Sequence, residues 1–490
     1  MERLFNIRFS WYWLTVCGLF VLVIGYSSYK LTESPPTWFD EGLYIQAAQS
    51  LAERGVESIQ VAPGVFENAG HITGGYPFLA PIALSLSLFG NSLPAARAPM
   101  VLFIVLCALA VFLVIYKLHG PRDALYSLLL FATFPLLYGN GKNVLGEVPG
   151  IFYTLLALYF LWCLERSQFR KMRFYIYAGM FIGLAAATKP VFFLLPLTAG
   201  LVFLFFIRSR PWNLRGIGVG GLSCVAPLAL WVYLQFGGGD VAVSIFQHYA
   251  NPYAESSLVS TVFQNFLRFF KEATPLYCGA LMALWALATG IRVYRKEKVF
   301  LAEWAALAFS VLILLAYLRT AGWYRYFFEA MVLALIFAPY SLRVITREIE
   351  HRWQNLRLGI VVPVLLILLA ALQFYQLNFS SWVAEHYGST QTAMLEDYFS
   401  SFNVDVGVLV YNAPEIVPFL QTKNYYQYVD IEPTGSLAYG KENISLLTKG
   451  VPVNVVVTAS NYQQHKDLFE HYRKSGAIGG YLMLATQNTK

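Results

Sequence analysis

Residues 11–29 read WYWLTVCGLFVLVIGYSSY, a run without a single charge. An α-helix needs about 20 apolar residues to cross the hydrocarbon core of a bilayer. The run is too long for a signal-peptide core and lacks a small-residue cleavage site, so we expect a retained transmembrane helix. Of the 490 residues, 57% are hydrophobic and only 13% are charged. This composition excludes a cytosolic enzyme, a secreted disulfide scaffold and a disordered chain.

Further apolar runs predict a polytopic α-helical membrane protein with about 11 transmembrane helices in all. After the first span they cover residues 95–117, 122–140, 147–165, 174–188, 191–207, 216–236, 275–292, 300–318, 326–342 and 358–377. The run 76–89 is shorter and contains Pro77 and Pro81. We therefore expect an interfacial or re-entrant helix there, on the outer face.

Every second loop between these spans is basic, and these loops hold more than half of the 35 Lys and Arg residues. They are the N-terminus with Arg3 and Arg8, and the loops around 117–122, 166–173, 208–215, 292–298 and 343–357. Basic loops stay in the cytoplasm, which predicts a cytoplasmic N-terminus and an outer C-terminus. The net charge of +7 thus reflects topology and indicates no nucleic-acid partner. The five cysteines lie in apolar segments without a CxxC pair and predict no redox site.

Residues 1–378 form the predicted membrane domain, with large outer loops at 31–94 and 237–274. Residues 379–490 differ, because short β-rich runs alternate there with helical patterns. The β-rich runs are 406–411, 453–458 and 480–485, and the helical patterns are 414–422 and 463–474. This alternation predicts a small extracytoplasmic α/β domain. It has neither a GxGxxG motif nor a P-loop, so nothing there indicates nucleotide binding.

Two adjacent carboxylates, Asp40 and Glu41, stand in the stretch WFDEGLY at 38–44, directly after the first span. Pro35 and Pro36 end the preceding helix, and an amphipathic helix follows. A carboxylate held beside hydrocarbon is weakly solvated, which raises its basicity. Such a group suits a general base or a metal ligand. The alternative is a helix N-terminus, where acidic residues interact favourably with the helix dipole.

This pattern resembles the signature of the GT-C glycosyltransferases. More narrowly, it is similar to the branch that contains protein O-mannosyltransferases and the aminoarabinose transferase of lipid A. Other stretches agree in order over residues 1–345. They are Tyr76-Pro77 to Gly90 with Arg97-Ala98-Pro99, Asn143 to Pro149 with Glu147 where Asp is more usual, Thr188-Lys189-Pro190, and Tyr324-Arg325-Tyr326.

The resemblance implies an enzyme that takes a sugar from a polyprenyl-phosphate donor. It passes the sugar to a lipid, glycan or protein acceptor on the outer face of the membrane, usually with inversion. On this resemblance Asp40 is the general base, and Glu41 and Glu147 support or orient it or bind a metal.

Three cations, Lys189, Arg325 and Arg97, stand at predicted outer ends of helices, against the positive-inside trend. A lipid phosphate leaving group needs cations at this interface, and Lys and Arg both bind phosphate well. We expect these three residues, with Tyr324, to bind the donor phosphate. The alternative is that the cations extend to lipid headgroups.

A divalent metal ion is a further expectation, because the related lipid A enzymes hold one with a Glu and a His in such loops. The candidates here are Glu67, His71 and His248, although a surface histidine is the alternative for His248. Glu329 lies inside a predicted span, where an acid is functional by default. Its alternative is an ion pair with Arg319 or Arg325.

The alternative function is that of a transporter or flippase for a polyprenyl-linked lipid. Charged residues are scarce at mid-membrane and gather at one face, which favours the glycosyltransferase. The basic loops and the short N-terminus suit a bacterial inner membrane, with the C-terminal domain in the periplasm.

Overall fold

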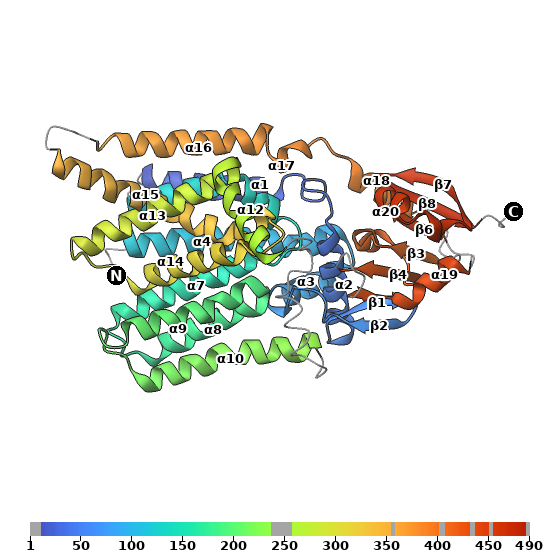
Figure 1. The fold of residues 1–490 in the computed structure, drawn as a ribbon, viewed down its shortest axis with the longest axis horizontal. Coiled ribbons are helices and arrows are strands. Elements are labelled where there is room, and N and C mark those ends of the chain that lie inside the picture. The colour runs from blue at the N-terminus through green and yellow to red at the C-terminus, as the bar shows by residue number, and fades with distance from the viewer. Residues whose placement is uncertain are drawn as a thin grey trace.

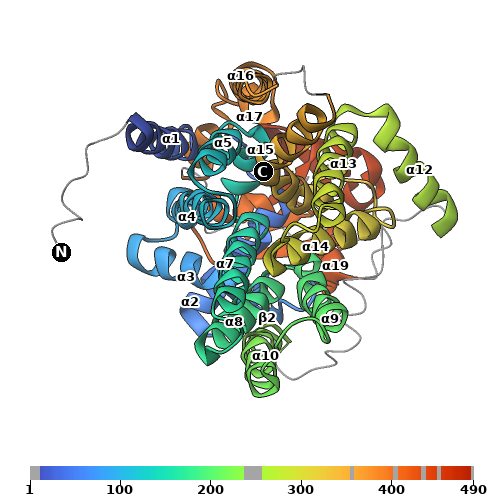
Figure 2. The same cartoon turned by 90° about the vertical axis from the view of Figure 1, so that its left-hand side faces the viewer.

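The computed structural model describes residues 11–236, 257–353, 358–400, 407–431, 437–449 and 454–486. A bundle of long helices fills one part of the molecule, and a C-terminal β-sheet lies at the opposite end (Figure 1). Figure 2 looks at the end of the bundle that faces away from this sheet. The chain is therefore a multi-pass helical protein with an attached sheet domain.

Seven helices in the described residues are long and apolar enough to cross a membrane. They are α1 (Trp11–Ser28), α4 (Leu93–His119), α7 (Glu147–Arg166), α10 (Leu214–Phe236), α13 (Ala273–Tyr294), α15 (Phe328–Arg352), preceded by the 3-10 turn η3 (Tyr324–Phe327), and α16 (Val361–Phe379). An eighth span results if α5 (Pro121–Ala132) and α6 (Pro135–Gly141), which are bent by 60°, count as one. Shorter apolar helices are α3 (Tyr76–Phe89), α8 (Met172–Thr188), η2 (Pro190–Phe193) with α9 (Leu194–Phe206), and α14 (Leu301–Tyr317). The polytopic helical fold is confirmed, and the count of eleven spans stays a prediction.

The first helix shows how the sequence places such a span. In α1 the buried residues Val16, Leu19, Val23 and Ser27 recur every three or four positions, so they form one stripe. Most of the remaining surface is apolar and exposed, as at Val21. A helix with a narrow packed stripe and an exposed apolar face is suited to the lipid boundary of a bundle.

The C-terminal segment folds into a six-stranded mixed sheet with the strand order β5-β4-β3-β6-β8-β7. Its strands are β3 (Val408–Tyr411), β4 (Tyr425–Asp430), β5 (Ala438–Tyr439), β6 (Asn454–Thr458), β7 (Tyr472–Ile478) and β8 (Tyr481–Thr486). The central β3 pairs in parallel with β4 and β6, and the outer pairings are antiparallel. Short helices accompany it, namely α17 (Trp382–Glu385), α18 (Gln391–Ser400), α19 (Ile444–Thr448) and α20 (Ala459–Gln464). The predicted α/β character is confirmed.

Two helical predictions in this domain are wrong in extent. The pattern 463–474 yields α20, a 3-10 turn and then strand β7, because Phe469 and Tyr472 bury their rings in the small core of the sheet. The pattern 414–422 gives only a 3-10 helix, η4 (Pro414–Phe419), in which Pro418 lacks the N–H that a longer helix requires. Tertiary burial overrides the local pattern in the first case, and proline does so in the second.

The first outer loop packs onto this domain. It forms α2 (Phe39–Arg54) and a hairpin of β1 (Ser58–Ala62) and β2 (Val65–Asn68). The side-chain amides of Gln46 and Gln427 bond each other at 3.1 Å, and Asn443 donates to the Val61 carbonyl at 2.8 Å. The position of α2 is therefore fixed from both the membrane bundle and the sheet.

Gly42 marks a close approach of α2 to the C-terminal domain. A Cβ at this position would lie 2.3 Å from the Pro414 carbonyl oxygen and 2.4 Å from the Glu415 backbone nitrogen. Only glycine allows this backbone-to-backbone approach.

We predict that Gly42→Ala lowers the thermal stability of the purified protein by the equivalent of about 1–3 kcal/mol, the usual cost of overpacking. Gly18→Ala is the control, because nothing lies within 4 Å of the Cβ that it adds to α1. Equal melting temperatures for the two variants would contradict this close packing.

Candidate active site

The start of α2 settles which of the two adjacent acids caps the helix. Glu41 Oε2 accepts the backbone N–H of Trp38 at 3.2 Å, as in a capping box. The Asp40 carboxylate, in the same first turn, instead accepts a hydrogen bond from Arg325. The helix-terminus interpretation therefore holds for Glu41 and leaves Asp40 available for another role.

Glu41 also forms a fully buried ion pair with Arg97 of α4. Arg97 Nε and Nη2 donate to the two carboxylate oxygens at 2.7 Å each, and both side chains are 0% exposed. Arg97 Nη1 donates to the carbonyls of Leu31 and Pro35 at 2.6 and 2.9 Å. The backbone N–H of Val144 donates to Glu41 at 3.0 Å. This one pair thus joins the turn after α1, the start of α2, α4 and the loop before α7.

Asp40 pairs with Arg325, which lies on η3 at the opening of α15. Arg325 Nη1 donates to Asp40 Oδ2 at 2.7 Å, and both side chains are partly exposed. The guanidinium also lies 5.0 to 6.0 Å from the ring centres of Trp323, Tyr326 and Trp38. Aromatic walls and partial exposure leave the pair accessible to a small ligand.

A second ion pair joins Glu147 and Lys189. Glu147 is the first residue of α7, and Lys189 lies between α8 and η2. Gly146 keeps the approach open, since a Cβ there would lie 3.2 Å from Lys189 Cγ. The second carboxylate oxygen of Glu147 has no hydrogen-bond partner among the described residues.

Tyr44 lies between the two ion pairs. Its ring centre is 5.9 Å from Lys189 Nζ, and its hydroxyl bonds Thr73 Oγ1 at 2.7 Å. Burial raises the pKa of Tyr44 well above its usual value, and the charge of Asp40 raises it further. Tyr44 therefore stays neutral. It lies close enough to Asp40 and Glu147 for both charges to act on it, so the two ion pairs form one cluster.

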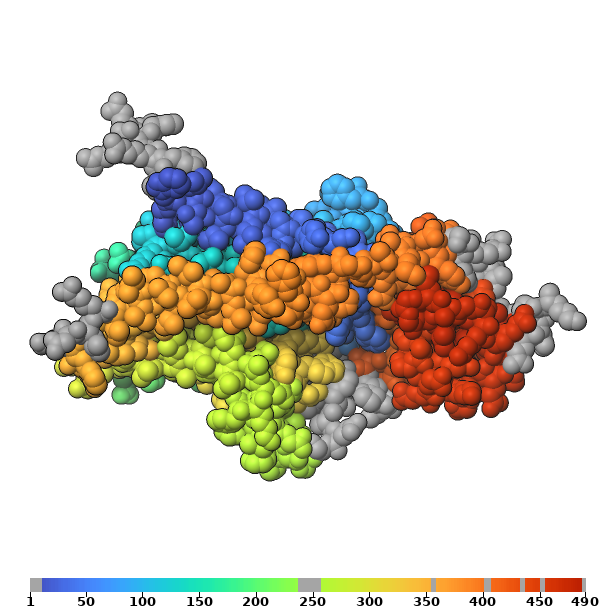
Figure 3. All heavy atoms as spheres, turned by 90° about the horizontal axis from the view of Figure 1, so that it is seen from above, coloured from blue at the N-terminus to red at the C-terminus, as the bar shows by residue number. Residues whose placement is uncertain are grey.

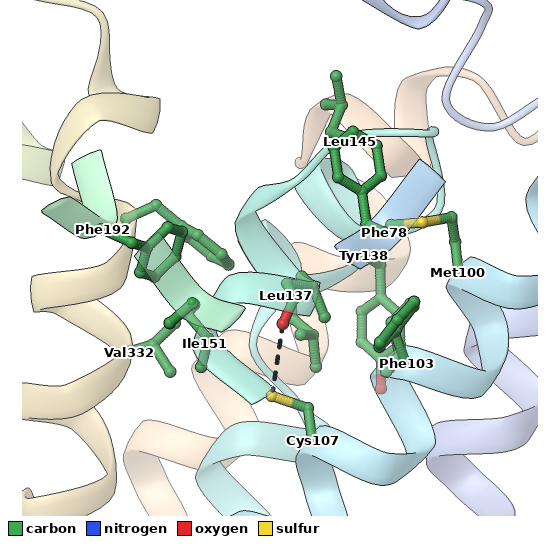
Figure 4. Packing of buried hydrophobic residues seen from close by; sticks show 14 of the residues in the cluster. Phe78, Met100, Phe103, Cys107, Leu137, Tyr138, Leu145, Ile151, Phe192 and Val332 are labelled. Atoms are coloured by element: carbon green, nitrogen blue, oxygen red, sulfur yellow. Dashed lines mark hydrogen bonds between the residues drawn. The ribbon is translucent and has the colours of Figure 1, made fainter. Parts of the chain in front are cut away.

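A dense apolar core packs close to this cluster and holds its helices in place (Figure 4). The residues labelled there are Phe78, Met100, Phe103, Cys107, Leu137, Tyr138, Leu145, Ile151, Phe192 and Val332. Phe192 follows Lys189 by one turn and packs on Gly150, where a Cβ would come within 2.1 Å of its ring. The same contact therefore fixes Lys189 and Glu147 relative to each other.

Glu329 is a third acid near this cluster. It is fully buried in the first turn of α15, close enough to Glu147 and Lys189 to interact with their charges. Neither of its carboxylate oxygens has a hydrogen-bond partner among the described residues. The alternative pairing of Glu329 with Arg319 or Arg325 is therefore wrong.

Two residues expected at the donor phosphate lie elsewhere. Arg97 is buried, and its guanidinium is occupied by Glu41 and backbone carbonyls. The Tyr324 hydroxyl donates to Glu272, which also pairs with Arg268 of α12 (Leu258–Lys271) at 2.8 Å. Sequence order places Tyr324 beside Arg325, but the 3-10 turn directs its side chain to a different cluster. Tyr326 and Tyr44, which stand in the quoted motifs but were given no role, lie at the site instead.

The candidate metal ligands do not gather here. The Gly440 N–H donates to Glu67 at 3.0 Å, and the His71 ring lies 5.3 Å from the ring of Tyr439. Both residues thus face the C-terminal domain, and His248 lies outside the described residues. In the described part of the chain, no three His, Cys, Asp or Glu side chains are grouped to hold a metal ion.

Comparisons with known sequences agree with the motif order. Residues 77–231 match the family described as dolichyl-phosphate-mannose-protein mannosyltransferase. An undecaprenyl phosphate-alpha-4-amino-4-deoxy-L-arabinose arabinosyl transferase of Edwardsiella ictaluri is 30% identical over 169 residues, which cover 33% of this chain and 29% of that protein. The protein of the same name from Pseudomonas aeruginosa is 29% identical over 151 residues, 30% of this chain and 27% of that protein. The matches thus span less than a third of the length of these relatives.

Solved structures match almost the whole chain. The structure of ArnT from Cupriavidus metallidurans bound to undecaprenyl phosphate aligns with a TM-score of 0.65 at 13% identity, over 98% of both chains. The archaeal oligosaccharyltransferase AglB from Archaeoglobus fulgidus, in complex with an inhibitory peptide and a dolichol-phosphate, aligns with a TM-score of 0.56 over 99% of this chain and 75% of that one. The chain has the GT-C fold, and the resemblance to its mannosyltransferase and arabinosyltransferase branch is confirmed.

We predict that Arg97→Met is strongly destabilising, by about 3–5 kcal/mol, because it leaves the Glu41 carboxylate buried and unpaired. The double variant Arg97→Met/Glu41→Gln should recover part of this loss. Thermal unfolding in detergent measures both effects, with Arg170→Met, an exposed loop arginine, as the control. A single Arg97→Met variant with parental stability would show that the pair does not hold these segments together.

Proposed function

We propose that this chain is a membrane glycosyltransferase that moves a sugar from a polyprenyl-phosphate donor to a lipid, glycan or protein acceptor. One observation carries the proposal, namely the two carboxylate–cation pairs, Asp40–Arg325 and Glu147–Lys189, gathered around Tyr44. The relatives that it resembles are named as transferases, which favours this function over transport of a polyprenyl-linked lipid.

The two cations suit the donor phosphate. A phosphate that binds between Lys189 and Arg325 replaces their carboxylate partners and receives charge-assisted hydrogen bonds. Such contacts stabilise the charge that develops on the phosphate oxygen as the sugar leaves. Binding of the donor to Arg325 would also free Asp40 from its ion pair, so the base becomes available only when donor is present.

Asp40 then acts as the general base. It accepts the proton of the acceptor nucleophile, whose electron pair forms the new bond to the anomeric carbon. The bond from that carbon to the phosphate oxygen breaks on the opposite face, and polyprenyl phosphate leaves with the bonding electrons. Attack opposite the leaving group inverts the anomeric centre, and the proton on Asp40 passes to solvent.

The remaining acids position these groups. Glu41 holds the first turn of α2 through Arg97 and so sets where Asp40 lies. Glu147 holds the Lys189 side chain in place in the absence of donor. Neither residue needs to touch the sugar.

The orientation in the membrane follows from the charge distribution. The end of the bundle away from the sheet carries the basic loops, so we place it in the cytoplasm. The sheet domain and the Asp40 cluster then lie on the outer face, which is the periplasm if the membrane is a bacterial inner membrane.

We predict that Asp40→Asn folds and binds donor but transfers sugar 10²–10⁴ times more slowly, the usual cost of losing a general base. Transfer from a purified polyprenyl-phosphate sugar measures this, and Asp467→Asn, an exposed acid of the sheet domain, is the control. A well-folded Asp40→Asn protein with near-parental turnover would remove Asp40 from the mechanism.

We also predict that the variant Lys189→Met/Glu147→Gln binds a polyprenyl phosphate about 10 to 150 times more weakly, because it loses a charge-assisted contact worth roughly 1.5–3 kcal/mol. Replacing both partners avoids a buried unpaired carboxylate, so the fold is kept. Competition binding in detergent gives the affinity, beside Glu147→Gln alone, which retains the cation. Parental affinity in the double variant would show that Lys189 does not meet the phosphate.

A further inference from the structure

A small basic pocket lies at the end of the bundle away from the sheet, between α5, α15 and α16. Figure 2 shows these three helices side by side at that end. The pocket has a volume of about 110 Å³. Its polar wall includes Arg122, Arg343 and Arg347, and its apolar wall includes Val362 and Leu366 of α16.

The charges in this pocket are not balanced. Arg343 pairs with Asp123, and Glu350 accepts the backbone N–H of Leu358 at 2.5 Å. Within the described residues, neither Arg122 nor Arg347 forms an ion pair with a carboxylate. Both lie close enough to Asp123 for a longer-range electrostatic interaction with its carboxylate. Two guanidinium groups are thus available to bind an anion.

Backbone geometry adds to the positive potential. The pocket is lined by Arg122 and Val362, which lie in the first turns of α5 and α16. Neither helix has a side-chain cap at its N-terminus. Pro121 and Pro363 have no N–H, and the Val361 N–H donates to the Leu358 carbonyl at 2.9 Å, so these two turns contribute chiefly the positive ends of their helix dipoles. Arg343 Nε, which is buried, also has no hydrogen-bond partner among the described residues.

The pocket opens beside a surface suited to acyl chains. α16 runs along the outside of the bundle (Figure 3). Leu365 and Leu372, on the flank of α16 next to the pocket-lining Val362 and Leu366, are 45 and 54% exposed. A ligand held here would place its polar end among the arginines and its apolar part along α16. That division matches a phospholipid and not a free ion.

We propose that this pocket binds the phosphate group of an anionic phospholipid, whose acyl chains lie along α16. Basic pockets between transmembrane helices are suited to such headgroups. The site lies at the opposite end of the bundle from Asp40, so it is separate from the proposed donor site and does not depend on it.

The test measures lipid binding to the purified full-length protein in neutral detergent, by native mass spectrometry and by thermal stability. The probes are phosphatidylglycerol, phosphatidylcholine with the same acyl chains, and inorganic phosphate. We expect phosphatidylglycerol to bind and stabilise, phosphatidylcholine to bind far more weakly, and inorganic phosphate to compete poorly. Stabilisation by inorganic phosphate equal to that by phosphatidylglycerol would overturn the lipid assignment, as would equal binding of the two lipids.

The variant Arg122→Gln/Arg347→Gln removes the two unpaired cations without breaking an ion pair. Each arginine near an anionic lipid contributes about fivefold, so the affinity for phosphatidylglycerol should fall by about 25-fold. Arg170→Gln/Arg173→Gln is the control with the same loss of charge at the same end of the bundle. An equal loss of affinity in both variants would show general surface attraction and overturn the site.

Discussion

The buried pair of Glu41 and Arg97 is the interaction on which the arrangement of the outer face depends. A carboxylate and a guanidinium with no exposure to solvent are stable only when their remaining hydrogen-bonding groups are satisfied, and here backbone groups of three segments satisfy them. The turn after α1, whose carbonyls accept hydrogen bonds from Arg97, also contacts the C-terminal domain. In this turn Glu33 accepts the N–H groups of Thr392 and Ala393 at 3.0 and 2.9 Å. A change at this pair would therefore move α2, the sheet domain and the loop before α7 together.

The position of Asp40 is a consequence of that framework. Because Glu41 takes the capping role and the ion pair with Arg97, its neighbour is directed away from the framework and meets Arg325. Lys189 reaches the same place through its pair with Glu147, and Tyr44 lies between the two pairs. Each cation is thus neutralised while no phosphate is bound, which lowers the cost of holding charge beside the membrane. An anionic donor would exchange one partner for another instead of filling an empty charged site.

Much of this arrangement was predictable from the sequence, since uncharged runs and basic loops mark the helices, and the motif order pointed to Asp40, Glu147, Lys189 and Arg325. The structure brings these four side chains together. Sequence could not show which way neighbouring residues face. Arg97 turns into the protein and Tyr324 turns toward Glu272, because a helix and a 3-10 turn direct adjacent side chains apart. Strand β7 could not be predicted from the sequence either, because Tyr472, whose ring is buried in the sheet core, lies in a stretch with a helical pattern.

The most direct measurement is a structure of the protein with a polyprenyl-phosphate sugar analogue bound in a lipid nanodisc. We predict that phosphate oxygens lie within hydrogen-bonding distance of Lys189 Nζ and the Arg325 guanidinium, and that Asp40 has left Arg325 and faces the anomeric carbon. A phosphate bound elsewhere, with the 2.7 Å contact between Asp40 and Arg325 intact, would contradict the proposed function of this cluster.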